Sequence, residues 1–120
     1  GNMSYNISFK VKIDGTDQYI VAYDPDANIT WNLRDMIRAS TGLEWENEAD
    51  NGLCSEVIEK IEWGYTRLTY APDVYKKYES DNGWGTIEGC AAFFYRILVA
   101  WRDFKRASPE LARVATFWIE

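Results

Sequence analysis

The stretch TIEGCAAFFYRILVAWRDF, residues 86–104, decides the fold of this chain. Thr86 is a good helix cap, and apolar residues recur after it at the three- and four-residue spacing of one helix face. That stripe contains Ile87, Cys90, Ala91, Phe94, Ile97, Leu98 and Trp101, and Phe93 and Phe104 widen it. A stripe of this width predicts a central helix that other elements cover on several sides.

The N-terminal segment has the period of a strand instead. Apolar and polar residues alternate across residues 5–13, and the apolar set is Tyr5, Ile7, Phe9, Val11 and Ile13. Residues 14–17, Asp-Gly-Thr-Asp, have the composition of a hairpin turn, and residues 18–23 form a second β-rich run. The pattern predicts an antiparallel hairpin over residues 5–23.

A short helix is predicted after this hairpin. Asp24-Pro25-Asp26 ends the second strand, because proline cannot continue the ladder of hydrogen bonds. Apolar residues then recur at helical spacing around residues 33–37. Thr30 or Asn32 is a suitable cap for this helix, and Gly42 is a suitable stop.

A second amphipathic helix is predicted over residues 57–68, ending before Pro72. Pro72 is placed to open a further short helix through Tyr78. Polar loops are predicted on either side of these helices, at residues 44–52 and 80–85.

The C-terminal segment completes the predicted fold. Ser108-Pro109 starts a turn after the long helix, and residues 114–119 are rich in the β-branched and aromatic types of a strand. The fold class is therefore α+β, with one compact domain over residues 1–120. We expect a small antiparallel sheet, formed by the N-terminal hairpin and the C-terminal strand, packed against three to four helices on one face.

Charge and composition favour binding over catalysis. The chain has 13 Lys and Arg against 19 Asp and Glu, and its net charge of −6 disfavours direct binding to nucleic acid or to anionic membranes. It has no histidine, which excludes serine or cysteine nucleophiles activated by histidine and zinc sites built on it. We expect no catalytic residue, no metal and no cofactor. Catalysis by carboxylates alone, as in glycoside hydrolysis, is the alternative.

Cysteine usage and hydropathy predict a cytoplasmic protein. Cys54 and Cys90 form no CxxC pair and are expected to be buried free thiols in a reducing compartment. The longest apolar run, residues 90–101, is too short to span a bilayer. Met3 leads directly into the first strand without a signal peptide, and Gly1-Asn2 is typical of a remnant of cloning.

The first candidate site is an acidic segment around a tryptophan. It consists of Glu44, Trp45, Glu46, Glu48 and Asp50. An exposed Trp45 rimmed by carboxylates is typical of an anchor that engages a basic protein surface. The alternative is that Trp45 folds back into the core and the carboxylates are merely solvated.

The second candidate site is the loop that enters the central helix. It consists of Asn82, Gly83, Trp84, Gly85 and Thr86. Glycines here let a ligand approach the backbone, the helix amides could receive a phosphate, and Trp84 could stack on a base. Glu88 in the first turn opposes an anion. The alternative is a tight turn with a helix cap, in which Trp84 covers a hydrophobic edge.

A third pattern has the spacing of calcium ligands. Asp24, Asp26 and Asn28 occupy positions 1, 3 and 5 of an EF-hand loop, and Asp35 falls at position 12. Ile29 replaces the glycine that the sharp turn of such a loop needs. We therefore interpret these side chains as turn and capping groups, and we predict no metal site.

The chain resembles the small, acidic, aromatic-rich accessory proteins carried by phages and prophages of low-GC bacteria. The resemblance rests on Met3-Ser4-Tyr5 leading into a hairpin, on Trp31-Asn32-Leu33-Arg34 and on Asn82-Gly83-Trp84-Gly85-Thr86. It implies a class of function: such proteins block a host protein or sequester a nucleotide signal of host defence. The prediction is a non-enzymatic protein that blocks a host defence protein with a basic surface. The alternative is a sponge for a nucleotide-like ligand at the Trp84 loop, and a homodimer is possible.

Overall fold

The computed structural model describes residues 4–120 and has the predicted α+β fold. Its strands are β1 (Ser4–Lys12), β2 (Tyr19–Tyr23), β3 (Asn28–Thr30), β4 (Ala49–Leu53) and β5 (Thr116–Ile119). Its helices are α1 (Arg34–Thr41), α2 (Cys54–Tyr70), α3 (Ile87–Ala107) and α4 (Pro109–Val114), with the 3-10 helices η1 (Trp31–Leu33) and η2 (Pro72–Tyr78). The cloning remnant predicted at Gly1-Asn2 and the start at Met3 lie outside the described residues.

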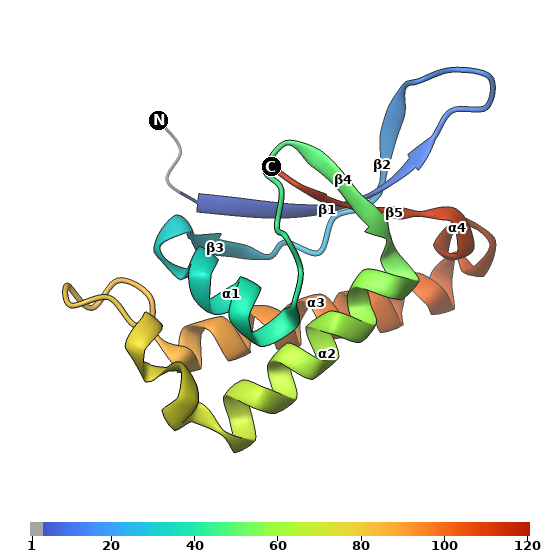
Figure 1. Ribbon diagram of the computed structural model, residues 1–120. Helices are drawn as coiled ribbons and strands as arrows, with labels where there is room; N and C mark the ends of the chain where they lie inside the picture. Colours follow the sequence, from blue (N-terminus) through green and yellow to red (C-terminus); the bar gives the residue numbers. More distant parts are fainter. Residues whose placement is uncertain (1–3) are drawn as a thin grey trace.

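The strands form one antiparallel sheet centred on β1 (Figure 1). β1 pairs with β2 through the predicted hairpin, whose turn is closed by the Ile13 amide donating to the carbonyl of Gln18 at 2.8 Å. β5 pairs with the other edge of β1, as predicted, and β4 flanks β5, giving the order β2-β1-β5-β4. The hairpin and the closing strand are therefore both confirmed.

Two strands were not predicted. β3 lies along the same edge of β1 as β2, so it resumes the ladder after the interruption around Pro25. β4 occupies part of residues 44–52, and the prediction of a polar loop is wrong for residues 49–52. The polar residues of β4 are extended because β5 offers them an unpaired edge, and this partner outweighs their weak strand propensity.

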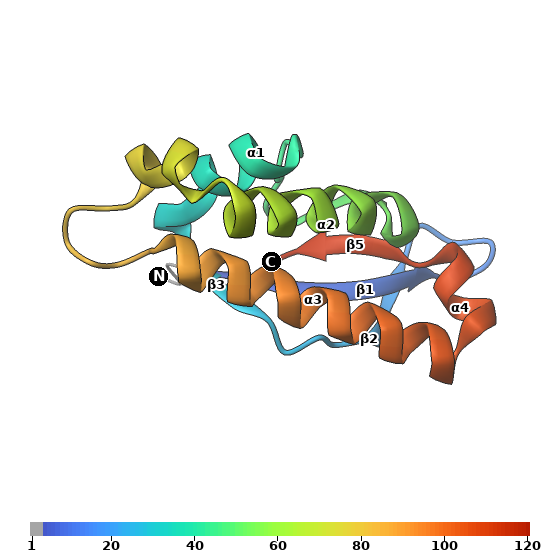
Figure 2. The ribbon, with the colours of Figure 1, turned by 90° about the horizontal axis from the view of Figure 1, so that it is seen from below.

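Helices α1, α2 and α3 lie on one face of this sheet (Figures 1 and 2), as predicted. The central helix predicted over residues 86–104 is α3, which packs beside α2. Phe9 of β1 lies at the centre of the core under these helices. Its ring centroid lies 5.8–6.1 Å from those of Phe104, Phe117, Trp101 and Tyr23. No helix among residues 4–120 covers the opposite face of the sheet.

The helices of this layer approach one another closely at Gly64 of α2. A Cβ at this position would lie 2.6 Å from Thr41 Cγ2 of α1 and 2.8 Å from Phe94 Cε2 of α3. Both distances are far below van der Waals contact, so only glycine fits at the point where α2 meets both neighbours.

The ends of the helices follow the predicted caps. Thr86 Oγ1 accepts a hydrogen bond from the Gly89 amide at 3.0 Å at the start of α3. Thr30, rather than Asn32, caps η1, and Gly42 ends α1 in the left-handed region with φ 77°. Pro72 opens η2, which runs through Tyr78 as predicted.

The edge strand β4 is preceded by a loop that one side chain closes. Asn51 Oδ1 accepts from the Glu46 amide at 2.9 Å. Its Nδ2 donates to the carbonyls of Glu46 at 2.9 Å and of Ala49 at 3.0 Å. These backbone groups, at the entrance to an edge strand, are therefore already bonded within the chain.

Candidate functional site: the open face of the sheet

The face of the sheet opposite the helices carries an aromatic pair. Trp118 of β5 alternates with core residues and therefore points to this face, opposite Ser8 of β1 and Asp50 of β4. Its ring centroid lies 4.9 Å from that of Tyr19 and 4.4 Å from Lys10 Nζ. Both aromatic side chains are half-buried, so part of each ring remains exposed.

One carboxylate contacts this pair, and others lie on neighbouring segments. Asp50 Oδ2 accepts a hydrogen bond from the Tyr19 hydroxyl at 3.4 Å. Exposed Glu46 and Glu48 belong to the segment that leads into β4, and Glu120 follows β5. We call this surface the acidic aromatic face, and it consists of Tyr19, Glu46, Glu48, Asp50, Trp118 and Glu120.

The lysines on this side do not reverse its charge. Lys10 Nζ forms an ion pair with Glu120 Oε1, and Lys12 Nζ lies 3.4 Å from Asp17 Oδ1. Each cation is thus matched by a carboxylate. The carboxylates of Glu46, Glu48 and Asp50 have no such cation among the ion pairs of residues 4–120, so the face as a whole is acidic.

Trp45 is not part of this surface. The prediction that Trp45 is an exposed anchor is wrong, because its side chain is 0% exposed. Its ring centroid lies 5.7 Å from that of Tyr5 and 6.0 Å from those of Phe93 and Phe117. The alternative, that Trp45 folds back into the core, is confirmed. Burial of so large an apolar ring outweighs the charge of its sequence neighbours, even though the indole Nε1 finds no hydrogen-bond partner.

The carboxylates of the predicted acidic segment separate into two groups. Glu44 lies 3.3 Å from the guanidinium of Arg38 on α1, and this ion pair places it beside the helix. Glu46, Glu48 and Asp50 are exposed near β5 and belong to the acidic aromatic face. The structure therefore places one of the predicted carboxylates, Asp50, opposite Trp118 and turns the predicted anchor into the core.

The loop at Trp84 adopts the predicted tight turn. Asn82 Oδ1 accepts from the Trp84 amide at 2.9 Å, and Ser80 Oγ donates to the Trp84 carbonyl at 2.6 Å. Gly83 and Gly85 have φ 77° and 104°, which favour glycine. Trp84 itself is 67% exposed, so the interpretation that it covers a hydrophobic edge is wrong.

The amides at the start of α3 do not form the predicted phosphate site. The Ile87 amide donates to Glu79 Oε2 at 2.8 Å, and the Gly89 amide donates to Thr86 Oγ1. A carboxylate therefore already occupies the position at which a phosphate would bind. A groove of about 460 Å³ lies beside Trp84, and no charged side chain lines it; its other residues are Ser4, Asn28, Ile29, Thr30 and Asn32.

The calcium-like pattern is used for local structure, as interpreted. Asp24 Oδ1 accepts from the Asp26 amide at 2.8 Å, which is an Asx turn. Asn28 Nδ2 donates to Ser4 Oγ at 2.9 Å and to Asn6 Oδ1 at 2.8 Å. The side chains do not converge, and residues 4–120 contain no cluster of three acidic or cysteine side chains suited to a metal ion.

Both cysteines are buried and free, as predicted. Burial raises the pKa of the Cys90 thiol to about 12. Burial also raises the pKa of the Cys54 thiol far above its usual value, and the negative charge of Asp50 adds to the shift. A thiolate is the reactive form of cysteine, so burial and the raised pKa values disfavour both thiols as nucleophiles near neutral pH.

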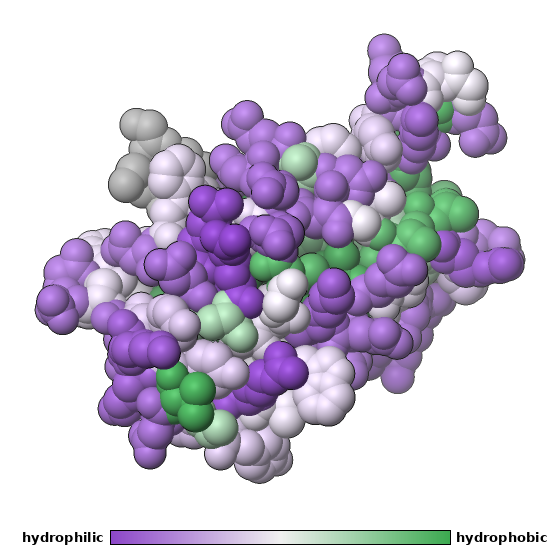
Figure 3. Space-filling model, in the orientation of Figure 1, coloured by the Kyte–Doolittle hydropathy of each residue, from purple (hydrophilic) through white to green (hydrophobic). Residues whose placement is uncertain are grey.

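A separate apolar region lies between the hairpin and α4. Figure 3 shows it among the polar residues that cover most of this side of the molecule. Three exposed apolar side chains belong to β4 and α4, near the point where α4 leads into β5: Leu53, Leu111 and Val114. This region is distinct from the acidic aromatic face.

Trp118 and Tyr19 were missed by the sequence prediction of sites. Residues 114–119 were predicted as a strand, and alternation within it places Phe117 and Ile119 on one face. Trp118, between them, must then lie on the face opposite the core. This alternation is the pattern that could have identified Trp118.

The chain matches no family model, no curated protein and no solved structure. None of the helices within residues 4–120 combines the length and the apolar character needed to cross a membrane.

Proposed function

We propose that this protein is a non-enzymatic binding protein whose acidic aromatic face occupies a basic surface on a larger protein. The observation that carries the proposal is the partly exposed Trp118–Tyr19 pair with one carboxylate in contact and others on neighbouring segments, on the uncovered side of the sheet. Aromatic anchors supply most of the binding energy at such interfaces. Carboxylates at the rim select a partner of opposite charge and speed its association.

The rigidity of this surface supports the proposal. Trp118 Nε1 donates to Thr116 Oγ1 at 3.0 Å, and its ring is held between Lys10 and Tyr19. These side chains project from paired strands rather than from loops. A partner would therefore meet a surface that loses little conformational entropy on binding.

Several features support binding rather than catalysis. The chain has no histidine, and its two thiols are buried with raised pKa values. The resemblance to phage accessory proteins makes a host defence protein the proposed class of partner. Free buried thiols suit the reducing cytoplasm, which is the proposed location. The homodimer that the sequence allows would use the apolar region of Leu53, Leu111 and Val114, which leaves the acidic aromatic face free.

The experiment is capture from a bacterial lysate with matched charge variants. The double variant Glu46→Lys/Glu48→Lys reverses two carboxylates of the face, and Glu59→Lys/Glu62→Lys makes the same change on exposed positions of α2. We expect the wild-type chain and the α2 variant to retain the same host protein, and the face variant to lose it. Trp118→Ala should lose it as well, at low salt and at high salt.

The outcome against the proposal is equally concrete. A host protein that binds all of these variants equally uses another surface, and the acidic aromatic face would then have no role. Capture of nothing by the wild-type chain from lysates of several low-GC bacteria would also contradict the proposal. Circular dichroism of each variant checks that the fold is intact.

A further inference from the structure

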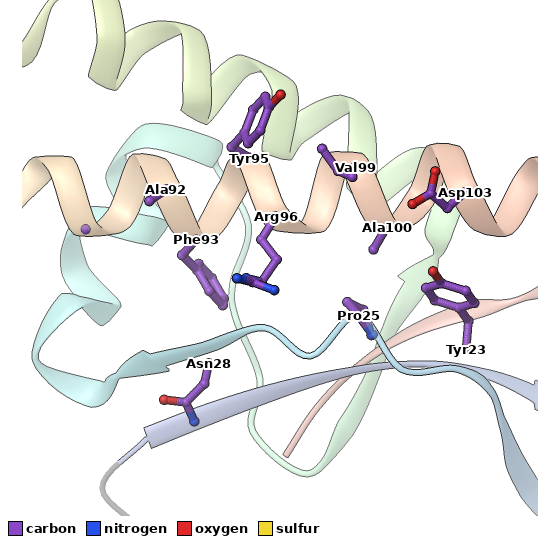
Figure 4. Close-up of a pocket in the computed structure, with 11 residues that line it drawn as sticks. Tyr23, Pro25, Asn28, Ala92, Phe93, Tyr95, Arg96, Val99, Ala100 and Asp103 are labelled. Atoms are coloured by element: carbon purple, nitrogen blue, oxygen red, sulfur yellow. The ribbon is translucent and has the colours of Figure 1, made fainter.

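A groove of about 670 Å³ lies between α3 and the segment that links β2 to β3 (Figure 4). This volume is typical of small-molecule sites. Its two walls come from different parts of the chain. Tyr23 at the end of β2 and Pro25 of the linking segment form one wall, and α3 forms the other with Phe93, Arg96 and Asp103. No residue of the acidic aromatic face lines it, so the groove is independent of the proposed protein interface.

Arg96 is available to a ligand in this groove. A carboxylate three or four residues away on the helix could pair with this arginine, but those positions here are Ala92, Phe93, Val99 and Ala100. Among residues 4–120, no carboxylate lies within ion-pair distance of its guanidinium. Figure 4 shows the side chain extending from α3 toward the linking segment, beside the ring of Phe93.

The other end of the groove has the opposite character. Asp103 lies seven residues after Arg96 on the same face of α3, which separates the two Cα atoms by about 10 Å. The Tyr23 ring lies across from Asp103 in Figure 4. Between the charged ends, Pro25 and Ala100 give the groove small apolar walls. Asp103 Oδ1 accepts from the side chain of Arg102 at 3.4 Å, and Oδ2 is the oxygen left to a ligand. The groove therefore presents a donor of hydrogen bonds at one end and one carboxylate oxygen as acceptor at the other.

We propose that this groove binds a phosphorylated small molecule of the nucleoside monophosphate class. The planar guanidinium of Arg96 matches two phosphate oxygens at once, and a phosphate monoester carries more charge than a carboxylate. The base and the ribose supply N–H and O–H donors for Asp103. The separation of about 10 Å between the Cα atoms of Arg96 and Asp103 is close to the length of a mononucleotide. Tyr23, which is half-buried, supplies ring surface for the apolar face of the base.

The experiment is isothermal titration calorimetry with four nucleoside monophosphates, GMP, AMP, CMP and UMP. We expect at least one of them to bind, and Arg96→Gln to weaken its binding tenfold or more. Arg106→Gln removes the same charge from an exposed position of α3 that does not line the groove, and it should leave the affinity unchanged. Asp103→Asn should weaken the mononucleotide but leave the affinity for inorganic phosphate unchanged.

Three outcomes overturn this proposal. The first is absence of binding by all four mononucleotides at millimolar concentration. The second is equal affinity in wild type and Arg96→Gln, and the third is a loss in Arg106→Gln as large as in Arg96→Gln. Guanosine without its phosphate should bind at least tenfold more weakly than GMP if GMP is the ligand that binds. Arg96 and Arg106 are both exposed, and melting temperatures confirm that the variants are folded.

Discussion

The two faces of the sheet use aromatic residues in opposite ways. On the covered face, Phe9 and Phe117 are completely buried under the helices. On the open face, Trp118 and Tyr19 pack against each other and remain partly exposed. Phe117 and Trp118 are neighbours in the sequence. Because successive side chains of a strand point to opposite faces, Phe117 points toward the helices and Trp118 toward the open face. Local composition therefore does not separate the aromatic residues that stabilise the fold from those available to a partner.

Hydrogen bonding separates the two faces in the same way. Trp118 Nε1 and the Tyr19 hydroxyl both have acceptors, Thr116 Oγ1 and Asp50 Oδ2. On the covered side, the Nε1 of Trp45 is buried without one. The core accepts this cost because the ring of Trp45 contributes more by burial than its N–H loses. On the open face the rings are only half-buried and gain less free energy from burial. Their polar atoms therefore keep hydrogen-bond partners.

The largest effect is expected for Phe9→Ala. This change removes a ring from the centre of the core and leaves a cavity between Phe104 and Phe117, so we expect a loss of about 3–5 kcal/mol in the free energy of unfolding. Urea denaturation measures it. A loss below that of Trp118→Ala would contradict the assignment of the two faces.

Gly64→Ala should have the next largest effect. Alanine is normally the better helix former, but its Cβ would collide with Thr41 and Phe94, so we expect a net loss of about 1–3 kcal/mol. Thr69→Ala, at an exposed position of α2, is the control and should change stability by no more than about 0.5 kcal/mol. Equal stability of Gly64→Ala and wild type would show that the helix layer is not closely packed there.

Trp118→Ala should cost about 1 kcal/mol of stability, because the ring is only half-buried and its contacts are with Tyr19 and Lys10. A double-mutant cycle with Tyr19→Ala isolates the ring pair, for which we expect a coupling energy of about 0.5–1.5 kcal/mol. Thermal denaturation of the four proteins supplies the cycle. Zero coupling would show that the aromatic pair of the open face is not a unit.

The last expected effect should appear only in alkaline solution. The pKa of Cys90 is raised in the folded state, so its contribution is fully present below the pKa of the unfolded thiol, about 8.5, and is lost as the pH rises toward about 12. Cys90→Ala should therefore lose less stability between pH 8.5 and 10.5 than the wild-type chain does. Melting temperatures across this range give the two slopes, and parallel slopes would mean that the thiol ionises equally in both states.

Much of the fold could be predicted because its main elements have strong internal patterns. The alternation of residues 5–13 and the apolar stripe of α3 each specify a covered face without reference to the rest of the chain. β4 could not be predicted, because its residues Ala-Asp-Asn-Gly-Leu have no such pattern. It exists because the edge of β5, which is 63 or more positions away in the sequence, is available to pair with it. Partners at long range leave no local pattern.

The candidate sites were harder to predict than the fold. Trp45 was assigned by the charge of its neighbours, yet Leu43 and Trp45 are buried and Glu44 and Glu46 are exposed, which is strand-like alternation. This alternation over residues 43–46 would have predicted that the Trp45 ring lies in the core. The groove at Arg96 had no local pattern at all, because its second wall comes from the segment after Tyr23.

The side chain of Asn51 has a consequence for how this protein behaves at high concentration. The Asn51 side chain is hydrogen-bonded to the backbone of Glu46 and Ala49. These amide and carbonyl groups are therefore not free to pair with a strand of another molecule. The molecule thus withholds a template for fibre growth along this edge of the sheet. We therefore expect Asn51→Ala to promote aggregation at high protein concentration, which light scattering measures.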